Sequence, residues 1–118
     1  MQYMILIYDD EKKLATMSQT EGTKFMDDYG TFTKQIVGSG HFKHGAPLQG
    51  TSSATTVRIR EGKTLTTHGP FAETREQLGG YYLVEAKDLD EAVGIAAKVP
   101  TAKHGSIEVR PVWAMGGD

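Results

Sequence analysis

One short segment near the start of the chain, residues 2–8, constrains the fold more than any other. It reads Gln-Tyr-Met-Ile-Leu-Ile-Tyr, a composition typical of a strand. In a strand alternate side chains point to opposite faces, and here positions 3, 5 and 7 and positions 4, 6 and 8 are all apolar. A strand with two apolar faces is covered on both of them. The segment therefore predicts a layered fold in which helices cover one face of a sheet and something else covers the other.

Two segments predict helices because each opens on a capping box, in which two side chains three residues apart satisfy free backbone amides. The first covers 18–38 and begins with Ser18 and Glu21, and its apolar residues then follow at steps of four, three and four. They are Phe25, Tyr29, Phe32 and Ile36. The second begins at Asp88 and ends before Pro100. Its expected apolar stripe consists of Leu89, Ala92, Val93 and Ala96.

The remaining apolar segments predict strands at 41–48, 55–60, 63–67, 81–86 and 107–112. Glu61-Gly62 predicts a tight hairpin, whereas 68–80 predicts a loop with one turn of helix after Pro70. The resulting order is that of a ferredoxin-like α+β fold, an antiparallel sheet with both helices on one face. Its other face would mix tyrosines with charges. A second copy of the same sheet is the simplest cover, so we expect a homodimer that encloses a polar cavity.

Composition excludes several classes of protein and fits a single small domain. The chain has 118 residues, of which 1–115 are expected to form the domain and 116–118 a tail. It has no cysteine, which excludes disulfides, thiolate metal sites and a cysteine nucleophile. Its net charge of −2 argues against a nucleic-acid module, and no apolar run is long enough to span a membrane. We expect a cytoplasmic protein.

The most distinctive stretch runs from His68 to Tyr82 and reads His-Gly-Pro-Phe-Ala-Glu-Thr-Arg-Glu-Gln-Leu-Gly-Gly-Tyr-Tyr. It resembles the signature of the YCII-related family, in the subgroup named for its Asp-Gly-Pro-Phe motif. Matches in the right order extend along the chain, from the opening strand through 54–58 and 88–92 to the ending at 104–111. The resemblance implies a ferredoxin-like fold that pairs into a dimeric α+β barrel, which agrees with the architecture inferred above from alternation and caps.

The chain departs from the family pattern at two places. His68 stands where the subgroup usually has Asp, and a histidine titrates near neutral pH. Better-studied relatives are proposed to use a His–Asp pair with the histidine on the first helix, but residues 18–38 contain no histidine, and Asp28 or Tyr29 aligns there. That pair is therefore not carried over to this chain. The resemblance supplies no reaction, and it links some relatives to sigma factors of transcription.

His68, Glu73 and Arg75 are the first group of candidate site residues. His68 suits a general acid–base because the ordinary pKa of histidine is about 6.5, or it caps the Gly-Pro turn. The carboxylate and guanidinium nearby would bind and polarise an acidic small molecule, or form an ion pair that orders the loop. Both interpretations stay open for these residues. The four histidines show no zinc spacing, so neither a metal nor a cofactor is expected.

Tyr81, Tyr82 and Arg110 are the second group of candidates. The two tyrosines are adjacent, so one should join the core and the other should face the cavity, and the sequence does not decide which. Arg110 shares a strand face with Glu108 and would line the cavity or join an ion-pair network.

Two functions remain open on the sequence alone. The first is a homodimer that binds a small polar or anionic metabolite near His68, with cofactor-free proton transfer of the isomerase or lyase type as its reaction. Arg75 or a tyrosine hydroxyl would then stabilise the developing negative charge. The second is a non-enzymatic binding or regulatory module that acts with a transcription factor.

Overall fold

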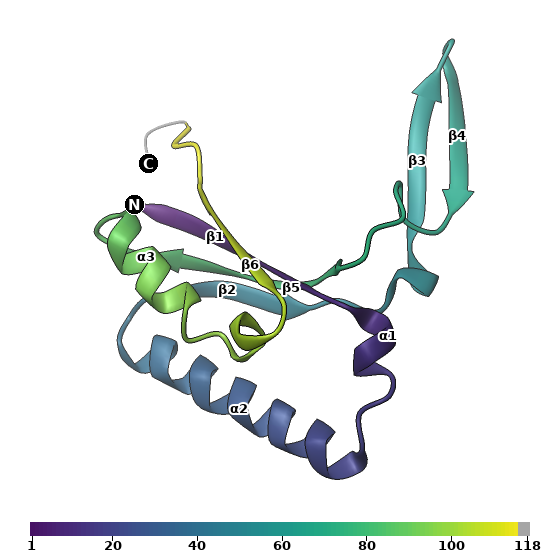
Figure 1. The fold of residues 1–118 in the computed structure, drawn as a ribbon. Helices are drawn as coiled ribbons and strands as arrows, with labels where there is room; N and C mark the ends of the chain where they lie inside the picture. Colours follow the sequence, from purple (N-terminus) through teal and green to yellow (C-terminus); the bar gives the residue numbers. More distant parts are fainter. Residues whose placement is uncertain (116–118) are drawn as a thin grey trace.

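A four-stranded antiparallel sheet with helices on one face forms the body of the molecule (Figure 1). The computed structural model describes residues 1–115, so the expected tail at 116–118 lies outside the described residues. The sheet has the order β2-β5-β1-β6 and consists of β1 Gln2–Asp9, β2 Phe42–Pro47, β5 Gln77–Glu85 and β6 Ser106–Pro111. Every neighbouring pair of strands is antiparallel. This is the strand order of a ferredoxin-like fold, and the predicted fold class is confirmed.

The odd-numbered side chains of β1 form the centre of the core. Tyr3, Ile5 and Ile7 are at most 7% exposed, whereas the even-numbered positions are only half-buried. In the register of the sheet, Ile5 lies opposite Tyr82 of β5 and Val109 of β6, so these side chains share the face toward the helices. The even-numbered positions point to the other side, where neither α2 nor α3 lies (Figure 1).

The long helix α2, Gln19–Gly38, packs beneath the sheet and begins as predicted. The Glu21 amide donates to Ser18 Oγ at 3.1 Å, and the Ser18 amide donates to the Glu21 carboxylate at 3.0 Å. Phe32 and Ile36 are buried in the core. Phe25 and Tyr29 lie earlier on the same stripe and are only half-buried, because the space between them and the sheet is not filled.

The second predicted helix is α3, Leu89–Ala96, and its predicted apolar stripe is partly wrong. Ala92 and Ala96 are buried as expected, but Leu89 and Val93 are each 49% exposed. The helix instead turns Ile95 into the core, because the face that contains 92, 95 and 96 is the one that packs on the sheet.

Glu91 links the N-terminus of α3 to His41, the residue before β2. The Lys87 amide donates to Glu91 Oε1 at 3.0 Å, and His41 Nε2 lies 3.2 Å from the same oxygen. The bond from the Lys87 amide, helped by that from His41, holds the pKa of Glu91 below its usual range. Asp88 caps the helix by accepting from the Glu91 amide.

Three short helical turns within the described residues were not expected from the sequence. They are α1 Glu11–Leu14, η1 Thr51–Ser53 and η2 Pro100–Lys103.

The start of β5 and the loop before it differ from the prediction. β5 begins at Gln77, four residues earlier than predicted, and the segment 69–76 is an irregular loop without the expected helical turn after Pro70. No helix in residues 1–115 is both long enough and apolar enough to cross a membrane.

The strands β3 Thr55–Arg60 and β4 Lys63–His68 form a separate hairpin, here called the arm (residues 55–68), that projects from the body (Figure 1). The predicted turn is present, with Glu61 and Gly62 at φ 51° and 74°. The two strands pair only with each other, and every residue on them except Thr56 is exposed. The arm is therefore an addition to the ferredoxin-like sheet rather than part of it.

Candidate functional site

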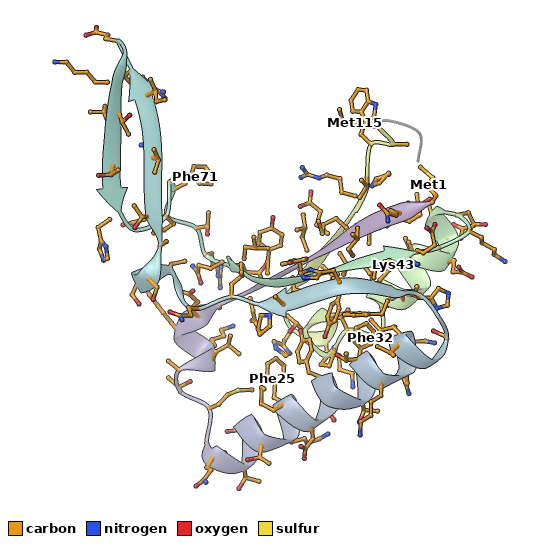
Figure 2. All side chains as sticks on the ribbon, turned by 180° about the vertical axis from the view of Figure 1, so that it is seen from behind. Met1, Phe25, Phe32, Lys43, Phe71 and Met115 are labelled. Atoms are coloured by element: carbon orange, nitrogen blue, oxygen red, sulfur yellow. The ribbon has the colours of Figure 1, made fainter. Side chains whose placement is uncertain are left out.

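A cavity of about 350 Å³ lies between α2 and the sheet. Figure 2 shows Phe25 and Phe32 directed from α2 toward the strands, and Phe25 forms part of the cavity wall. The walls are mostly apolar and include Ile7, Leu14, Phe25, Met26, Phe42 and Pro47. Ligand sites in proteins have volumes of about 300–1,000 Å³, so the cavity suits a small molecule.

Glycines on β2 and β5 belong to the strand side of this cavity. Gly45, Gly79 and Gly80 all line it. A Cβ atom at Gly45 would lie 2.7 Å from the Tyr82 ring, and one at Gly80 would lie 3.1 Å from the Ala46 carbonyl oxygen. Larger residues at these two positions would therefore push the ring or the neighbouring strand away, so close packing explains the glycines.

Asp9, the last residue of β1, forms the polar end of the cavity. It is 7% exposed. His104 follows η2, and its Nε2 lies 3.1 Å from Asp9 Oδ2, while the Asp10 amide donates to Oδ1 at 2.8 Å. The carboxylate is thus fixed by two partners. The His104 side chain is 47% exposed, so it connects this buried group to solvent.

Two hydroxyl groups lie at the same end of the cavity. The oxygens of Tyr29 and Thr101 are 2.6 Å apart, and Thr101 is only 1% exposed. Burial raises the pKa of Tyr29; the hydrogen bond with Thr101 opposes this rise, and the nearby Asp9 carboxylate adds to it. The Phe25 ring packs edge-on against Tyr29 at 5.1 Å and lies 5.9 Å from the ring of His104.

This arrangement can move a proton. A carboxylate can accept a proton, and the neutral tyrosine beside it can donate a hydrogen bond to an oxygen that becomes negative. Residues 1–115 contain no group of three or more His, Asp and Glu side chains placed to hold a metal ion.

The structure does not bring His68, Glu73 and Arg75 to this cavity. His68 ends β4 at the base of the arm, and the other two lie in the loop 69–76, where all three residues are exposed. The turn after His68 is fixed by other groups, since the Gly69 amide donates to the Ala54 carbonyl at 2.7 Å and the Thr56 hydroxyl donates to the Gly69 carbonyl at 2.8 Å. The roles expected for these three residues stay predictions.

The two adjacent tyrosines do face opposite ways. Tyr82 packs in the core, lines the cavity, and lies 2.7 Å from Thr33 Oγ1 through its hydroxyl. The Tyr81 hydroxyl lies 2.8 Å from His44 Nδ1, and the two rings stack. In the register of the sheet Tyr81 pairs with Leu6, so its side chain lies on the face away from α2 and α3.

Arg110 lies on that same face, here called the open face, which carries the side chains of Met4, Leu6, Tyr8, Tyr81, Leu83, Glu108 and Arg110. Its guanidinium donates to Glu108 at 2.7 Å, and the Tyr8 hydroxyl donates to the same carboxylate at 3.3 Å. These contacts, led by the bond from Arg110, lower the pKa of Glu108. Arg110 is thus part of an ion-pair network, and it does not line the cavity between α2 and the sheet. Its predicted place in a cavity enclosed by two copies of the sheet stays a prediction.

Sequence-based reasoning missed Asp9 and His104 as a pair. A signal for Asp9 was present, because it continues the odd-numbered positions 3, 5 and 7 that face the core, so the alternation predicts a buried carboxylate. The pairing with His104 joins residues 95 positions apart and leaves no local pattern.

The fold and the cavity define a ferredoxin-like α+β protein with a pocket of small-molecule size between helix and sheet. Residues 1–116 match the model of the YCII-related domain, and the chain therefore belongs to the YCII-related family. An uncharacterised protein of Rhizobium meliloti (strain 1021) is 39% identical over 114 residues, which are 95% of this chain and 92% of that protein.

Among solved structures, the chain is similar to 5-chloro-2-hydroxyhydroquinone dehydrochlorinase from Burkholderia phenoliruptrix AC1100, in complex with 2,5-dihydroxybenzoquinone. The TM-score is 0.54 at 17% identity, and the match covers 98% of this chain and 96% of the dehydrochlorinase. At this level of identity the similarity shows a shared fold.

Proposed function

We propose that the protein binds a small, neutral, ring-shaped molecule in the cavity between α2 and the sheet and moves a proton on it through Asp9. The observation that carries this proposal is the buried carboxylate of Asp9 at the end of a mostly apolar cavity, held by His104 at 3.1 Å. The volume of about 350 Å³ suits one substituted ring better than a long ligand. The ligand of the dehydrochlorinase structure, 2,5-dihydroxybenzoquinone, is also a single ring.

A neutral polar ligand is favoured over an anionic one, where the sequence left both kinds open. Arg75 and Arg110, which were expected to bind an anion, are not among the residues that line the cavity. The charged side chain that does line it is that of Asp9. In a mostly apolar site its carboxylate would repel a second negative charge.

The proposed reaction is isomerisation of a ring ketone, which needs no redox partner. Asp9 would accept a proton from the ligand carbon between a carbonyl group and a C=C bond, and the carboxyl group would return that proton to the far carbon as the double bond moves. The Tyr29 hydroxyl would donate to the carbonyl oxygen while negative charge develops there, with Thr101 donating to Tyr29. His104 acts through Asp9 as a positioning residue.

We also propose that the protein is a homodimer in which the open faces of two copies pack together. Met4, Leu6 and Leu83 leave apolar surface on this face that the helices do not cover. Two-fold pairing would bury this surface on both copies at once. Glu108 and Arg110 would lie in the same interface, where each already neutralises the charge of the other.

Binding is tested by titrating the full chain with hydroquinone, a neutral ring, and with 4-hydroxybenzoate, an anionic ring of similar size. We expect a thermal shift with hydroquinone and none with 4-hydroxybenzoate at equal concentration, since only a ligand that binds the folded state raises Tm. Asp9→Asn should admit the anion. Equal binding of both rings to the wild type would contradict the proposal of a neutral ligand. Failure of Asp9→Asn to bind 4-hydroxybenzoate would show that the charge of Asp9 does not exclude the anion.

Turnover is tested with cyclohex-3-enone, whose conversion to the conjugated cyclohex-2-enone is followed by ultraviolet absorbance. Asp9→Asn should lower kcat/KM by at least about 10²-fold, the usual contribution of a general base. His104→Gln keeps a donor toward Asp9 and should lose less activity than His104→Ala. Lys34→Gln, on the exposed side of α2, is the control that should leave the rate unchanged. Binding without turnover would favour the non-enzymatic binding module.

A further inference from the structure

The arm exposes apolar side chains that an isolated hairpin would have to bury in order to be stable. Val57, Ile59 and Leu65 are 60%, 64% and 49% exposed. A two-stranded hairpin is only marginally stable in water on its own. The register places Val57 and Ile59 on one face beside two threonines of β4, so this face of the arm is built from β-branched side chains with no covering element among the described residues.

The arm also stands on the open side of the sheet. In both views it rises from the body in the direction away from α2 (Figures 1 and 2). Six residues in each strand give it a length of about 20 Å at about 3.3 Å per residue, whereas packed sheets lie about 10 Å apart. The arm is therefore long enough to contact the side of a second sheet that packs on the open face.

The radius of gyration of the molecule is consistent with an arm that projects from the body. The radius of gyration is 16.4 Å. A compact chain of this length would have a radius of gyration of about 13.5 Å. The excess indicates that the arm reaches beyond the body instead of folding back on it.

Charge favours a second copy of the chain as the occupant of this space. The arm carries Arg58, Arg60 and Lys63 against Glu61, a net charge of +2. The whole chain has a net charge of −2, so the part outside the arm carries −4. The net charges of the arm and of the rest of the chain are therefore complementary between two copies. The register places Arg58, Arg60 and Lys63 on the face of the arm opposite to Val57 and Ile59, so these charges would lie beside the apolar contact and not within it. Two-fold symmetry would let each copy supply one arm and receive the other.

We propose that each arm packs against the side of the partner protomer. Val57 and Ile59 would be buried against the part of the partner that lies outside residues 55–68. This proposal rests on the homodimer proposed above and names the contact that holds it together. Phe71, 78% exposed beside the arm, would extend the same apolar contact (Figure 2).

Sedimentation of the full chain and two variants tests the contact. Ile59→Lys and Thr67→Lys each add one lysine to the hairpin, on opposite faces. We expect Ile59→Lys to raise the dimer Kd at least about tenfold and Thr67→Lys to change it by less than about threefold, since a buried apolar contact lies on one face only. A dimer as tight in Ile59→Lys as in the wild type overturns this contact of the arm but leaves the pairing of open faces standing. A monomeric wild type overturns both proposals.

A cross-linking experiment gives an answer even where Ile59→Lys disturbs the hairpin itself. Because the chain has no cysteine, Ile59→Cys provides a single attachment point for a benzophenone maleimide. After irradiation of an equal mixture of ¹⁴N- and ¹⁵N-labelled protein, we expect mixed-isotope peptides that join the arm to residues outside 55–68. Links from arm to arm, or links within one chain only, overturn the proposal.

Discussion

Removing the Tyr29 hydroxyl should destabilise the protein because it leaves a buried group without a partner. In the folded state the Tyr29 and Thr101 oxygens lie 2.6 Å apart, and Thr101 is 1% exposed. In Tyr29→Phe the Thr101 hydroxyl stays buried and unsatisfied, which costs about 1–2 kcal/mol. In Thr101→Val the Tyr29 hydroxyl still faces the cavity, where water can replace the lost partner, so the cost falls to about 0.5–1 kcal/mol.

The double variant Tyr29→Phe/Thr101→Val removes both partners and leaves no orphaned group. Its destabilisation should therefore not exceed that of Tyr29→Phe alone, which corresponds to a coupling free energy of about 1 kcal/mol. For a chain of 118 residues the unfolding entropy near Tm is about 0.25 kcal/mol per kelvin, so 1 kcal/mol shifts Tm by about 4 °C.

The assay is thermal and urea unfolding of the four proteins at one fixed protein concentration, because dimerisation would make Tm depend on concentration. Equal urea m-values would confirm that the variants unfold from equally compact states. Destabilisations of the single variants that add within about 0.3 kcal/mol in the double variant would refute the reasoning, since independent sites are additive.

Three further tests, two of them with a matched control variant, probe local structure. Ser18→Ala should lower the free energy of unfolding by about 1 kcal/mol through loss of the α2 cap, measured by urea unfolding, while Ser18→Thr should lose less. Gly105→Ala should cost about 1–3 kcal/mol, because its Cβ would collide with the Tyr8 carbonyl oxygen and lie 2.7 Å from Thr101 Cγ2; Gly22→Ala, whose Cβ meets nothing within 4 Å, is the control that should not destabilise. Glu91→Gln should lower Tm at pH 7, and this difference from the wild type should shrink as pH falls from about 4.5 through the lowered pKa of Glu91, because the carboxylate stabilises the fold only while it is ionised. A difference in Tm that stays constant down to pH 3 would contradict this assignment.

The fold was largely predictable because its signals are local. The capping box at Ser18 and the alternation of β1 depend on residues within a few positions of one another, and both are confirmed. At α3 the Asp88 cap is confirmed, but the capping box is incomplete because Glu91 accepts from the Lys87 amide. The rotation of α3 was not predictable, since Leu89 and Val93 fit an apolar stripe as well as Ile95 does and only packing on the sheet chooses between them. The direction of the arm was not predictable either, because a hairpin motif specifies its turn but not the element on which the hairpin packs.

The candidate site was harder to predict because it depends on tertiary structure. The family motif drew attention to residues 68–82, of which 79–82 line the cavity, whereas the exposed charged residues of the motif do not. Asp9 was detectable from its position in the alternation, whereas its contact with His104 exists only after β1 and η2 are brought together. A short-range motif therefore identified the family, and long-range packing made the cavity.

The position of β1 has a consequence for synthesis of the chain on the ribosome. β1 ends at Asp9, yet both of its hydrogen-bonded neighbours, β5 and β6, come after residue 76. At about 5–20 residues per second the strand waits roughly 3–14 s for its first neighbour to be made. During that interval a segment apolar on both faces is exposed, with Asp9 and Asp10 as the nearest charges to discourage its aggregation. We expect the nascent chain to be held by chaperones at this segment until about residue 85 has emerged.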